Sequence, residues 1–481
     1  MRVMNGKPFI HLFQVDKRSY CYDVNKNQII EIPKKVYQYL LTGQIDDRND
    51  AGEIKCYVEK LKEKEFLKSN HSQVSEHSAT ECYKYFVDND LGQLTLQVTQ
   101  KCNLDCGYCV YSGNYNNRHH ADKWMTFEIA QKAIDYYVAH SSDEEEVSLG
   151  FYGGEPLLAF DFIKECVAYA EEAFEGRKVM YSLTTNGTLL TDEKLNFLVH
   201  YNFAVLISLD GPKDVQNRHR KFANSEIGSF ETIMKNIKNL KLKYPDYYRN
   251  HVSFNTVLDQ RYPLTDIANF VLTNEIVRES RFNCSTINDT YADTEIRSSS
   301  VFLEEYQYEK FKTFLWLIGR LKKQEISPIM LSDFSSVRKM AILFDRYNRE
   351  ILPYKGHRGG PCIPGVRKLF VTVEGEFYPC ERVRENSKVP RIGDVYGGID
   401  EEKALSILNI ERISTEKCKN CWACFFCYLC VAQADDGNEL SECKLCKACG
   451  ECKINVEETM KDYVVLHELG YNQDLDADRL L

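Results

Sequence analysis

The stretch Leu94–Tyr111 constrains this chain more than any other, because it places three cysteines on a loop directly after a short apolar strand. Its sequence, LTLQVTQKCNLDCGYCVY, has the spacing C-x3-C-x2-C at Cys102, Cys106 and Cys109. An odd number of thiols leaves one outside any disulfide, and a closed structural zinc site needs four ligands. Three thiolates suit a [4Fe–4S] cluster in which one iron stays open for another ligand. The competing interpretation is a set of buried or zinc-binding thiols that lacks one ligand.

The composition favours a globular protein of two or three domains. The 481 residues include 43% hydrophobic and 12% aromatic side chains, which argues against wholesale disorder. A net charge of −10 provides no basic field, so no nucleic acid partner is expected. No apolar run reaches about 18 residues and the N-terminus lacks a signal-peptide core, so we expect no membrane association and a cytoplasmic location. In that compartment the nineteen cysteines favour metal ligands over disulfides.

Strand and helix patterns alternate from Leu91 to about Cys284, which predicts an α/β fold with a parallel sheet or partial barrel of six β/α units. The cysteine loop, GGEP, TTNG and SLDG follow the first four strands. Because ligands bind at the carboxyl ends of parallel strands, these motifs are expected to surround one site. The expected strands are Leu94–Thr99, Val147–Tyr152, Met180–Thr185, Ala204–Leu209, Val252–Leu258 and Arg281–Cys284, and the expected helices include Thr126–Ala139, Asp192–Val199 and Ser229–Leu242.

Residues 1–68 predict a small α+β module of three strands and two helices. We expect either a winged-helix-like unit whose strand edge accepts an extended peptide, or a plain packing appendage. A polar linker (Lys68–Thr80) follows, and a later insertion (Thr286–Asn348) is expected to hold one helix, Glu304–Leu321. The expected elements of the module are Phe9–Val15, Tyr20–Asp23, Gln28–Ile32, Lys34–Leu41 and Gly52–Leu67.

Eleven cysteines lie beyond position 361, which predicts a dedicated metal-binding region after a Pro/Gly-rich link that ends at Pro361. A hairpin is expected at Lys368–Val373 and Glu376–Tyr378, and a helical tail at Val456–His467. Paired C-x2-C also occurs in zinc ribbons, so zinc is the alternative. The five early cysteines, Cys21, Cys56, Cys82, Cys166 and Cys284, are expected to pack in the core.

The motifs CNLDCGYC, GGEP, TTNGT and SLDGP at successive strand ends resemble those of the radical S-adenosylmethionine (SAM) enzymes over residues 91 to about 284. The resemblance implies that Cys102, Cys106 and Cys109 are the catalytic cluster ligands. The open iron would bind SAM, and one electron would cleave it to a 5′-deoxyadenosyl radical. Simple turn chemistry is the alternative for two of the SAM contacts, Asn186 and Ser208. The implied SAM contacts are Tyr108 at the adenine, Gly153, Gly154 and Glu155 at the amino group, Asn186 and Ser208 near the ribose, and Arg220 at the carboxylate.

The pattern C-x12-G-x4-C followed by C-x2-C-x5-C resembles the SPASM extension of those enzymes, which holds auxiliary [4Fe–4S] clusters. The gap Cys427 to Cys430 is one residue shorter than usual, and no cysteine shortly precedes Cys362. The first cluster is therefore expected to have an open iron or an unusual ligand such as His357. Four thiols, Cys424, Cys443, Cys446 and Cys452, would bind a further metal or cluster, or one of them is the late ligand. The resemblance assigns Cys362, Cys380 and Cys430 to one cluster and Cys418, Cys421, Cys427 and Cys449 to the other.

The whole arrangement resembles maturases of ribosomally synthesised peptides. It divides into a PqqD-like leader-recognition module with its linker (1–80), a radical SAM core with an insertion (81–350) and a SPASM domain (351–481). CWACFFCYLC is most similar to the thioether-forming maturases of ranthipeptides (freyrasin-type) and Cys-rich peptides. The resemblance implies that a cysteine sulfur of a precursor peptide is joined to carbon, with electrons from a flavodoxin- or ferredoxin-type donor. The alternatives are another radical SAM modification, such as a C–C crosslink or sulfatase-type oxidation, and a non-catalytic iron–sulfur or zinc protein.

Overall fold

The computed structural model of this chain describes residues 6–45, 47–113, 115–292, 294–346, 351–360 and 362–471. Parts of the sequence predictions lie outside the described residues: residues 1–5 and 46 of the N-terminal module, residues 114, 293 and 347–350 of the core with its insertion, Pro361 of the Pro/Gly-rich link, and residues 472–481 of the C-terminal domain.

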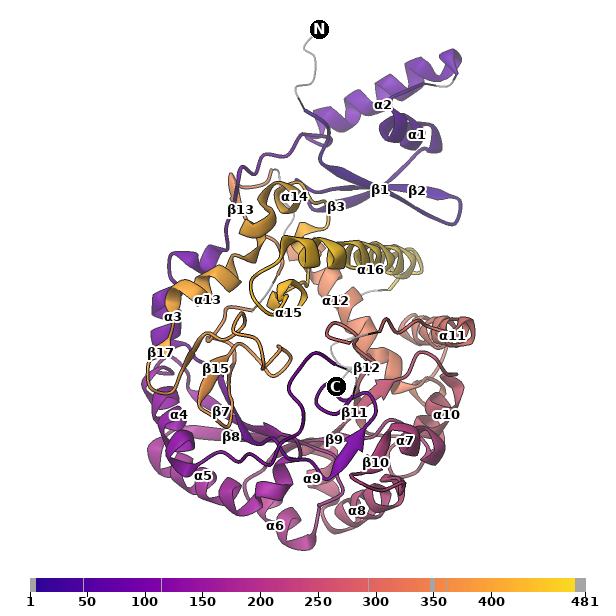
Figure 1. Cartoon of the computed structure of the whole chain (residues 1–481). Helices are drawn as coiled ribbons and strands as arrows, with labels where there is room; N and C mark the ends of the chain where they lie inside the picture. The colour runs from indigo at the N-terminus through magenta and orange to yellow at the C-terminus, as the bar shows by residue number, and fades with distance from the viewer. Residues whose placement is uncertain are drawn as a thin grey trace.

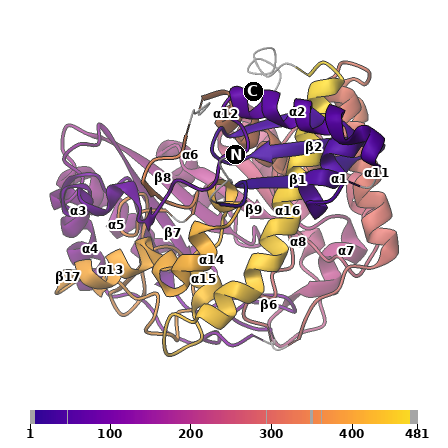
Figure 2. The same ribbon diagram turned by 90° about the horizontal axis from the view of Figure 1, so that it is seen from above.

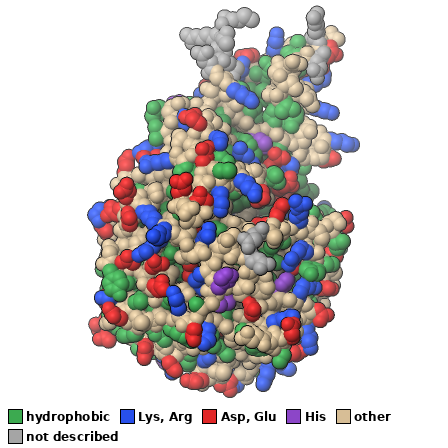
Figure 3. All heavy atoms as spheres, in the orientation of Figure 1, with side chains coloured by type: hydrophobic (Ala, Val, Ile, Leu, Met, Phe, Trp, Pro, Cys, Tyr) green, Lys and Arg blue, Asp and Glu red, His purple; other side chains and the backbone are tan. Residues whose placement is uncertain are grey.

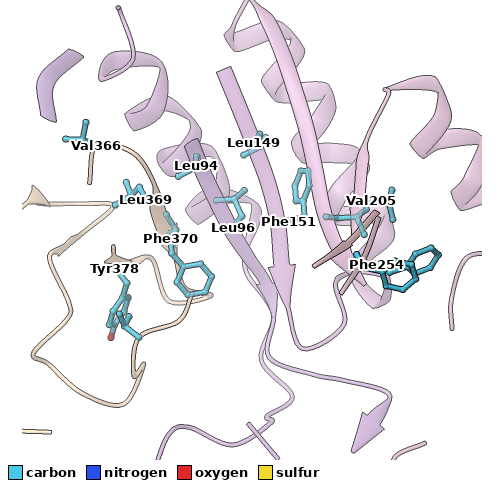
Figure 4. Close-up of a cluster of buried hydrophobic side chains, with 14 of the residues drawn as sticks. Leu94, Leu96, Leu149, Phe151, Val205, Phe254, Val366, Leu369, Phe370 and Tyr378 are labelled. Carbon is cyan, nitrogen blue, oxygen red and sulfur yellow. The ribbon is translucent and has the colours of Figure 1, made fainter. Parts of the chain in front are cut away.

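Six parallel strands form a curved sheet at the centre of the molecule, which confirms the predicted partial barrel (Figure 1). Each predicted strand lies within two residues of an observed one at both ends. Leu94 is opposite Leu149 and Leu96 is opposite Phe151, and these side chains pack together on one face of the sheet (Figure 4). The strands, in spatial order, are β5 (Gln93–Thr99), β7 (Glu146–Gly153), β8 (Lys178–Thr185), β9 (Ala204–Ser208), β11 (Val252–Leu258) and β12 (Arg281–Thr286).

Amphipathic helices cover the outer face of this sheet, as Figure 1 shows. In the first of them the predicted cap is observed, because the Thr126 side chain accepts a hydrogen bond from the Ile129 N–H. Ile134 of this helix is fully buried, and such burial contributes about 1.5–3 kcal/mol. The covering helices are α4 (Phe127–Ala139), α5 (Phe160–Ala173), α6 (Asp192–His200), α7 (Lys213–His219), α8 (Phe230–Lys243), α9 (Pro245–His251) and α10 (Thr265–Thr273).

The C-terminal hairpin continues the central sheet. Strand β14 (Leu369–Val371) pairs in parallel with β5, and β15 (Glu376–Tyr378) turns back from it through Gly375, whose φ of 83° suits glycine. Two short strands, β16 (Gly393–Asp394) and β17 (Gly398–Ile399), complete the edge. The predicted hairpin is therefore present, and it attaches the cysteine-rich region directly to the strand that leads into the cysteine loop.

The N-terminal module has the predicted strand order and lies over the long C-terminal helix α16 (Glu442–Glu468), as Figure 2 shows. The His11 ring stacks on Trp422 with 3.5 Å between centroids. The second helix is shorter than predicted, because Glu65 and Leu67 adopt positive φ angles of 68° and 63°. The elements are β1 (Ile10–Val15), β2 (Arg18–Asp23), β3 (Gln28–Ile32), α1 (Lys34–Thr42) and α2 (Ala51–Glu63).

Three segments differ from their predictions because of contacts that are distant in sequence. The expected linker contains β4 (Val74–Ser75), which pairs with β13 (Lys355–Gly356). The insertion holds two long helices, α11 (Ser300–Leu317) and α12 (Leu331–Arg346), of which only the first was predicted. Helix α16 begins fourteen residues before the predicted tail and carries the second cysteine run. The remaining helices are α3 (Tyr83–Asn89), α13 (Glu401–Leu408), α14 (Thr415–Lys419) and α15 (Val431–Ala434).

The early cysteines divide between core and surface. Cys21 and Cys166 are fully buried, as predicted, and Cys284 is partly buried. The prediction is wrong for Cys56 and Cys82, which are exposed, because Cys56 lies on the solvent face of α2 and Cys82 precedes α3.

Charged side chains of both signs are mixed over the surface seen in Figure 3. Across the described ranges, every helix is too short or too polar to cross a membrane.

Candidate active site

The cysteine loop is held by a small sheet of its own. Strand β6 (Leu104–Cys106) pairs antiparallel with β10 (Arg220–Phe222), which places Arg220 opposite Cys106. The Gly107 N–H donates to the His219 carbonyl at 3.2 Å, and the Cys109 N–H donates to the Cys106 carbonyl at 2.9 Å. The cysteine loop is therefore held in place by β10 and by the end of α7.

Burial keeps the thiols of Cys102 and Cys106 protonated in the absence of a metal. It raises the pKa of Cys102 to about 12, and it also raises the pKa of Cys106. The Leu104 N–H donates to the Cys102 sulfur at 3.4 Å, which favours the thiolate. Each thiol must lose its proton to bind iron, so cluster binding here releases protons.

The donor set fits a three-thiolate [4Fe–4S] cluster. Cys109 is close enough to Cys102 and Cys106 to oppose the ionisation of both, and Arg220 favours the charged form of Cys106. Among the described residues, no three His, Cys, Asp or Glu side chains converge on the position of a single metal ion. A cubane cluster does not require such convergence, because each thiolate binds a different iron. Three neighbouring thiols, of which Cys106 is buried, beside a buried guanidinium match that need.

Arg220 forms a buried ion pair that the sequence analysis did not predict. Its Nε donates to Asp210 Oδ2 at 2.9 Å and its Nη2 to Oδ1 at 3.2 Å, with both side chains under 10% exposed. The Tyr108 hydroxyl also donates to Asp210, and the Arg220 guanidinium lies 5.3 Å from the Tyr108 ring centroid. Burial raises the pKa of Tyr108 well above its usual range. Asp210 thus joins two of the predicted SAM contacts.

A second charged group lies behind the loop. His219 Nε2 is 2.8 Å from Asp259 Oδ2, and Arg261 binds Asp259 through Nε and Nη2 at 2.7 Å each. Burial opposes ionisation of Asp259, but these hydrogen bonds outweigh it and lower its pKa. The His219 ring meets the Tyr108 ring edge-on at 5.1 Å. The only sequence signal was position, since Asp259 directly follows a predicted strand.

Glu155 joins the ends of two strands. It is 1% exposed, its Oε1 accepts from the Leu157 N–H and the Thr185 hydroxyl, and its Oε2 accepts from the Asn186 N–H at 2.7 Å. Burial raises its pKa despite these bonds. Both carboxylate oxygens therefore have partners within the chain, and its predicted role at the SAM amino group stays a prediction.

Asn186 connects the third strand end to the cysteine loop. Its Nδ2 donates to Asn103 Oδ1 at 2.8 Å and lies 3.9 Å from the Cys102 sulfur, while its Oδ1 accepts from Thr188. The turn chemistry given as the alternative is therefore present, together with a contact to the cysteine loop, and the role of Asn186 near the ribose stays a prediction. Ser208 is buried at the end of β9.

The two glycines of GGEP allow the second strand end to approach the cysteine loop. A Cβ on Gly154 would lie 2.1 Å from the Lys101 carbonyl oxygen, and one on Gly153 would lie 2.4 Å from that of Thr99. The Gly154 N–H donates to the Thr99 carbonyl at 2.9 Å. The close approach that requires glycine is therefore between backbones, and a contact with SAM stays a prediction.

A buried carboxylate connects the cysteine loop with the C-terminal hairpin. Glu385, 3% exposed, binds the Tyr111 hydroxyl at 2.7 Å, the Gln97 amide at 2.8 Å and the Arg118 guanidinium. Arg118 also stacks over the Tyr111 ring at 3.8 Å. These contacts join residues 267 to 288 positions apart in the sequence, which no spacing rule predicts.

The C-terminal cysteines gather in two groups. Cys362 and Cys430 are close enough to Cys380 to oppose its ionisation, and burial raises the pKa of Cys380 and Cys430, whereas Cys362 is exposed. His357, the predicted unusual ligand, has its Nδ1 2.7 Å from the Arg358 carbonyl and its ring 4.6 Å from that of His77. The first predicted ligand set is thus close together, and its fourth ligand stays open.

The second group consists of Cys418, Cys421, Cys427 and Cys449, with Cys452 next to it. A hydrogen bond from Cys452, together with the charge of Arg358, lowers the pKa of Cys427 to about 6. Burial acts on this pKa in the opposite direction. On an α-helix, side chains three residues apart are offset by about 60° around the helix axis. The cysteines of α16 therefore change face along the helix, from exposed Cys443 to buried Cys452. Both Cys449 and Cys452 face this group, and the late ligand stays undecided between them.

The leftover thiols have different surroundings. Cys424 is buried in the main core, and Cys446 lies 3.3 Å from the Lys417 ammonium.

A cavity of about 1260 Å³ lies between the insertion helices, α16 and the second cysteine group. Its lining includes Thr286 at the end of β12, Lys310 and Phe314 from α11, Met340 from α12, and Cys427. It therefore extends from the last barrel strand to a predicted cluster ligand.

Comparisons with known proteins agree with this geometry. Residues 96–270 match the radical SAM superfamily. The chain is 27% identical over 224 residues to the radical SAM cyclopropyl synthase TigE of Paramaledivibacter caminithermalis, which is 44% of this chain and 45% of TigE. It is 34% identical over 161 residues to a cysteine-type anaerobic sulfatase-maturating enzyme of Clostridium novyi, which is 33% of this chain and 42% of that enzyme. The alignments thus span less than half of either relative.

Solved structures show the same fold. Native anSMEcpe with bound AdoMet aligns with 79% of this chain and 99% of its own at a TM-score of 0.56 and 21% identity. The complex of anSMEcpe with AdoMet and the Kp18Cys peptide aligns over the same shares at a TM-score of 0.54 and 20% identity. Residues 96–270 of this chain are therefore a radical SAM domain, and the central parallel sheet with its covering helices has the radical SAM fold.

Proposed function

We propose that this protein is a radical SAM peptide maturase that joins a cysteine sulfur of a precursor peptide to a carbon of another residue. The observation that carries the proposal is a link between the segments that carry two groups of thiols. Glu385, five residues after Cys380, binds Tyr111 and Arg118 at the end of the loop with Cys102, Cys106 and Cys109. A site for radical formation and a site for a substrate thiolate would thus lie on one connected scaffold.

The residues of the chain would divide the work. Cys102, Cys106 and Cys109 would hold the catalytic cluster, and the guanidinium of Arg220 would offset negative charge beside Cys106. When bound, the cluster and SAM supply a 5′-deoxyadenosyl radical that removes a hydrogen atom from the substrate. Cys362, Cys380 and Cys430 would hold an auxiliary cluster with one open iron for the peptide thiolate, and Cys418, Cys421, Cys427 and a late cysteine would hold the other. The reaction would require SAM, a Cys-containing precursor peptide and a low-potential electron donor of the flavodoxin or ferredoxin type.

The cavity beside Cys427 supports a peptide as the substrate. A volume of about 1260 Å³ exceeds the usual range for small-molecule sites, and its lining mixes Lys310, Asp462 and Asn455 with apolar side chains. A mixed lining of this kind suits the alternating backbone and side-chain groups of a peptide segment.

The edge strands of the N-terminal module support leader binding. Among the described residues, strands β1 and β3 each pair with β2 alone, so each has an edge where an extended peptide can add a strand. On adding a precursor peptide, hydrogen exchange should slow at residues 10–32. Unchanged exchange there, together with tight binding of the peptide, would place the leader elsewhere.

Reductive cleavage of SAM tests the enzyme class. The anaerobically reconstituted protein should form 5′-deoxyadenosine, and a Cys102/Cys106/Cys109→Ala triple variant should not. If neither protein forms it, the enzyme proposal fails and an iron–sulfur carrier or zinc protein remains.

Mass spectrometry of a Cys-containing precursor peptide tests the bond. A thioether removes two hydrogens from the peptide and protects the sulfur from alkylation, and prior alkylation of the cysteines should block the reaction. A two-hydrogen loss that persists after alkylation would reject thioether formation and favour a C–C crosslink.

Sulfatase-type oxidation is the second candidate, because the chain is 34% identical over 161 residues to a cysteine-type sulfatase-maturating enzyme. Oxidation of one residue leaves no bond between two residues. Fragmentation of the product between the modified positions would therefore separate it from a crosslinked peptide.

A further inference from the structure

Arg358, in the segment between α12 and the C-terminal hairpin, forms a buried ion pair with Glu411, which lies between α13 and α14. The side chain of Arg358 is 4% exposed and that of Glu411 is 1% exposed, with 3.6 Å between Arg358 Nε and Glu411 Oε2. Within the described structure, Arg358 Nε and Glu411 Oε1 have no hydrogen-bond partner. A buried guanidinium is costly unless it is held by opposite charge and hydrogen bonds, so this one requires an explanation.

The rest of the guanidinium faces the second cysteine group. Nη1 donates to the Cys427 sulfur at 3.4 Å, and Nη2 donates to the Leu429 carbonyl oxygen at 2.7 Å. Backbone hydrogen bonds also hold Arg358 in place. The N–H groups of Gly359 and Gly360 donate to the carbonyls of Cys424 and Cys427, at 2.6 Å each. A Cβ on Gly359 would lie 2.1 Å from the Phe425 carbonyl oxygen, so the backbone also fits closely.

Arg358 also lies between the two groups of C-terminal cysteines. Its Nη1 binds the sulfur of Cys427 in the second group, and its Nη2 binds the carbonyl of Leu429, the residue before Cys430 of the first group. A fixed positive charge close to these thiol groups lowers the energy of an electron added to a cluster that they bind.

We propose that Arg358 is a positioning residue that raises the reduction potential of the auxiliary cluster bound by Cys427. The inference rests on the proposed function, because it requires that cluster. A cluster gains one negative charge when it takes one electron from the donor protein and loses that charge when it passes the electron on. The guanidinium stays protonated throughout and favours the reduced form by charge and by its hydrogen bond to the ligand sulfur. Glu411 holds the guanidinium in place and moderates its charge.

The proposal is tested by redox titration of full-length protein that carries only auxiliary clusters. The Cys102/Cys106/Cys109→Ala background removes the catalytic cluster, and EPR follows the reduced auxiliary clusters. In that background Arg358→Gln should lower the ratio of reduced to oxidised cluster about tenfold at a given potential, a shift of about 59 mV to a more negative value. Arg358→Lys keeps the charge and should recover part of the shift. Arg412→Gln is the matched control, because Arg412 is an exposed arginine that binds Glu76 and should leave the potential unchanged.

Three outcomes would overturn the inference. An unchanged potential in Arg358→Gln at full iron content would show that the guanidinium does not tune the cluster. Loss of auxiliary iron in both the Gln and Lys variants, even when Glu411→Gln removes the unpaired charge, would assign Arg358 to loop structure alone. Absence of iron from the triple-Ala background itself would remove the auxiliary clusters, whereas 5′-deoxyadenosine formation by the wild type would still support the radical SAM part of the proposed function.

Discussion

At the scale of single residues, the site depends on buried charges that neutralise one another. Asp210 accepts hydrogen bonds from Arg220, from Tyr108 and from the Val257 N–H, so one carboxylate orders three elements around the cysteine loop. Breaking such a pair leaves an uncompensated charge in a dry environment, which costs more than the pair itself contributes.

Arg220→Met should therefore destabilise the metal-free protein by about 3–5 kcal/mol, because the Asp210 carboxylate remains buried without its partner. Denaturant unfolding measures the change. The double variant Asp210→Asn/Arg220→Met should be less destabilised than the sum of the two single variants. Additive effects would mean that the two side chains do not stabilise each other.

Asp259 predicts a pH dependence of stability. Its pKa is lower in the folded protein than in the unfolded chain, so its contribution is complete above about pH 4 and is lost as the pH falls through the folded value. Asp259→Asn should lower the melting temperature at pH 7, and the difference from wild type should shrink below about pH 4. Asp246→Asn, at an exposed carboxylate, is the control and should show little difference at either pH. A constant Asp259→Asn difference from pH 7 to pH 3 would contradict the prediction.

At the scale of secondary structure elements, the active-site end of the barrel depends on the close approach of β7 to the cysteine loop. Gly154→Ala would place a Cβ 2.1 Å from the Lys101 carbonyl, so the loop must move. We expect reduced iron incorporation at the catalytic site. Gly450→Ala on α16 is the control, because nothing lies within 4 Å of its added Cβ. Equal iron content in the two variants would show that the loop tolerates the displacement.

The Glu385 contact predicts coupling between the barrel and the hairpin. Glu385→Gln removes the charge that binds Arg118 and should weaken that contact by about 1.5–3 kcal/mol. Hydrogen exchange should then become faster both at residues 109–113 and at 381–387. Glu374→Gln, which removes an exposed ion pair with Lys123 in the same region, should change neither segment. Faster exchange in one segment only would mean that Glu385 does not connect them.

At the scale of the whole molecule, the N-terminal module is part of the main core. Phe13 and Tyr22 are at most 2% exposed and pack with side chains from α12 and α16. Removing residues 1–68 should therefore lower the melting temperature and expose α16 to proteolysis. Deleting the module would therefore not separate a loss of leader binding from a loss of stability. Hydrogen exchange in the intact chain measures leader binding without this problem. Leu41→Ala, at an exposed site in the module, should leave both measurements unchanged. An equally stable deletion variant would contradict this packing.

The sequence by itself determined most of the secondary structure elements and the grouping of three thiols on one loop. Strand and helix periodicity are local properties, so five of the six barrel strands were predicted to within one residue at their carboxyl ends. The C-x3-C-x2-C spacing marked the three thiols as candidate ligands, because ligands on one loop must be close in sequence. Where local pattern was weak, as in α12, or interrupted by cysteines, as in the first half of α16, helices were missed or begun too late.

Only the tertiary structure decided which charges meet. Glu385 and Arg118 are 267 residues apart, and Arg358 meets Cys427 and Glu411 across more than fifty, so no local spacing marks these pairs. Glu385 meets Arg118 because β14 pairs with β5 and so brings the hairpin region to the barrel sheet. Arg358 meets Cys427 because residues 358–360 bind the segment that carries the second cysteine group. The positions of the thiols follow from local chain geometry. The charged surroundings that set their protonation follow from packing between distant elements, because a charge interacts with what is near in space and not with what is near in sequence.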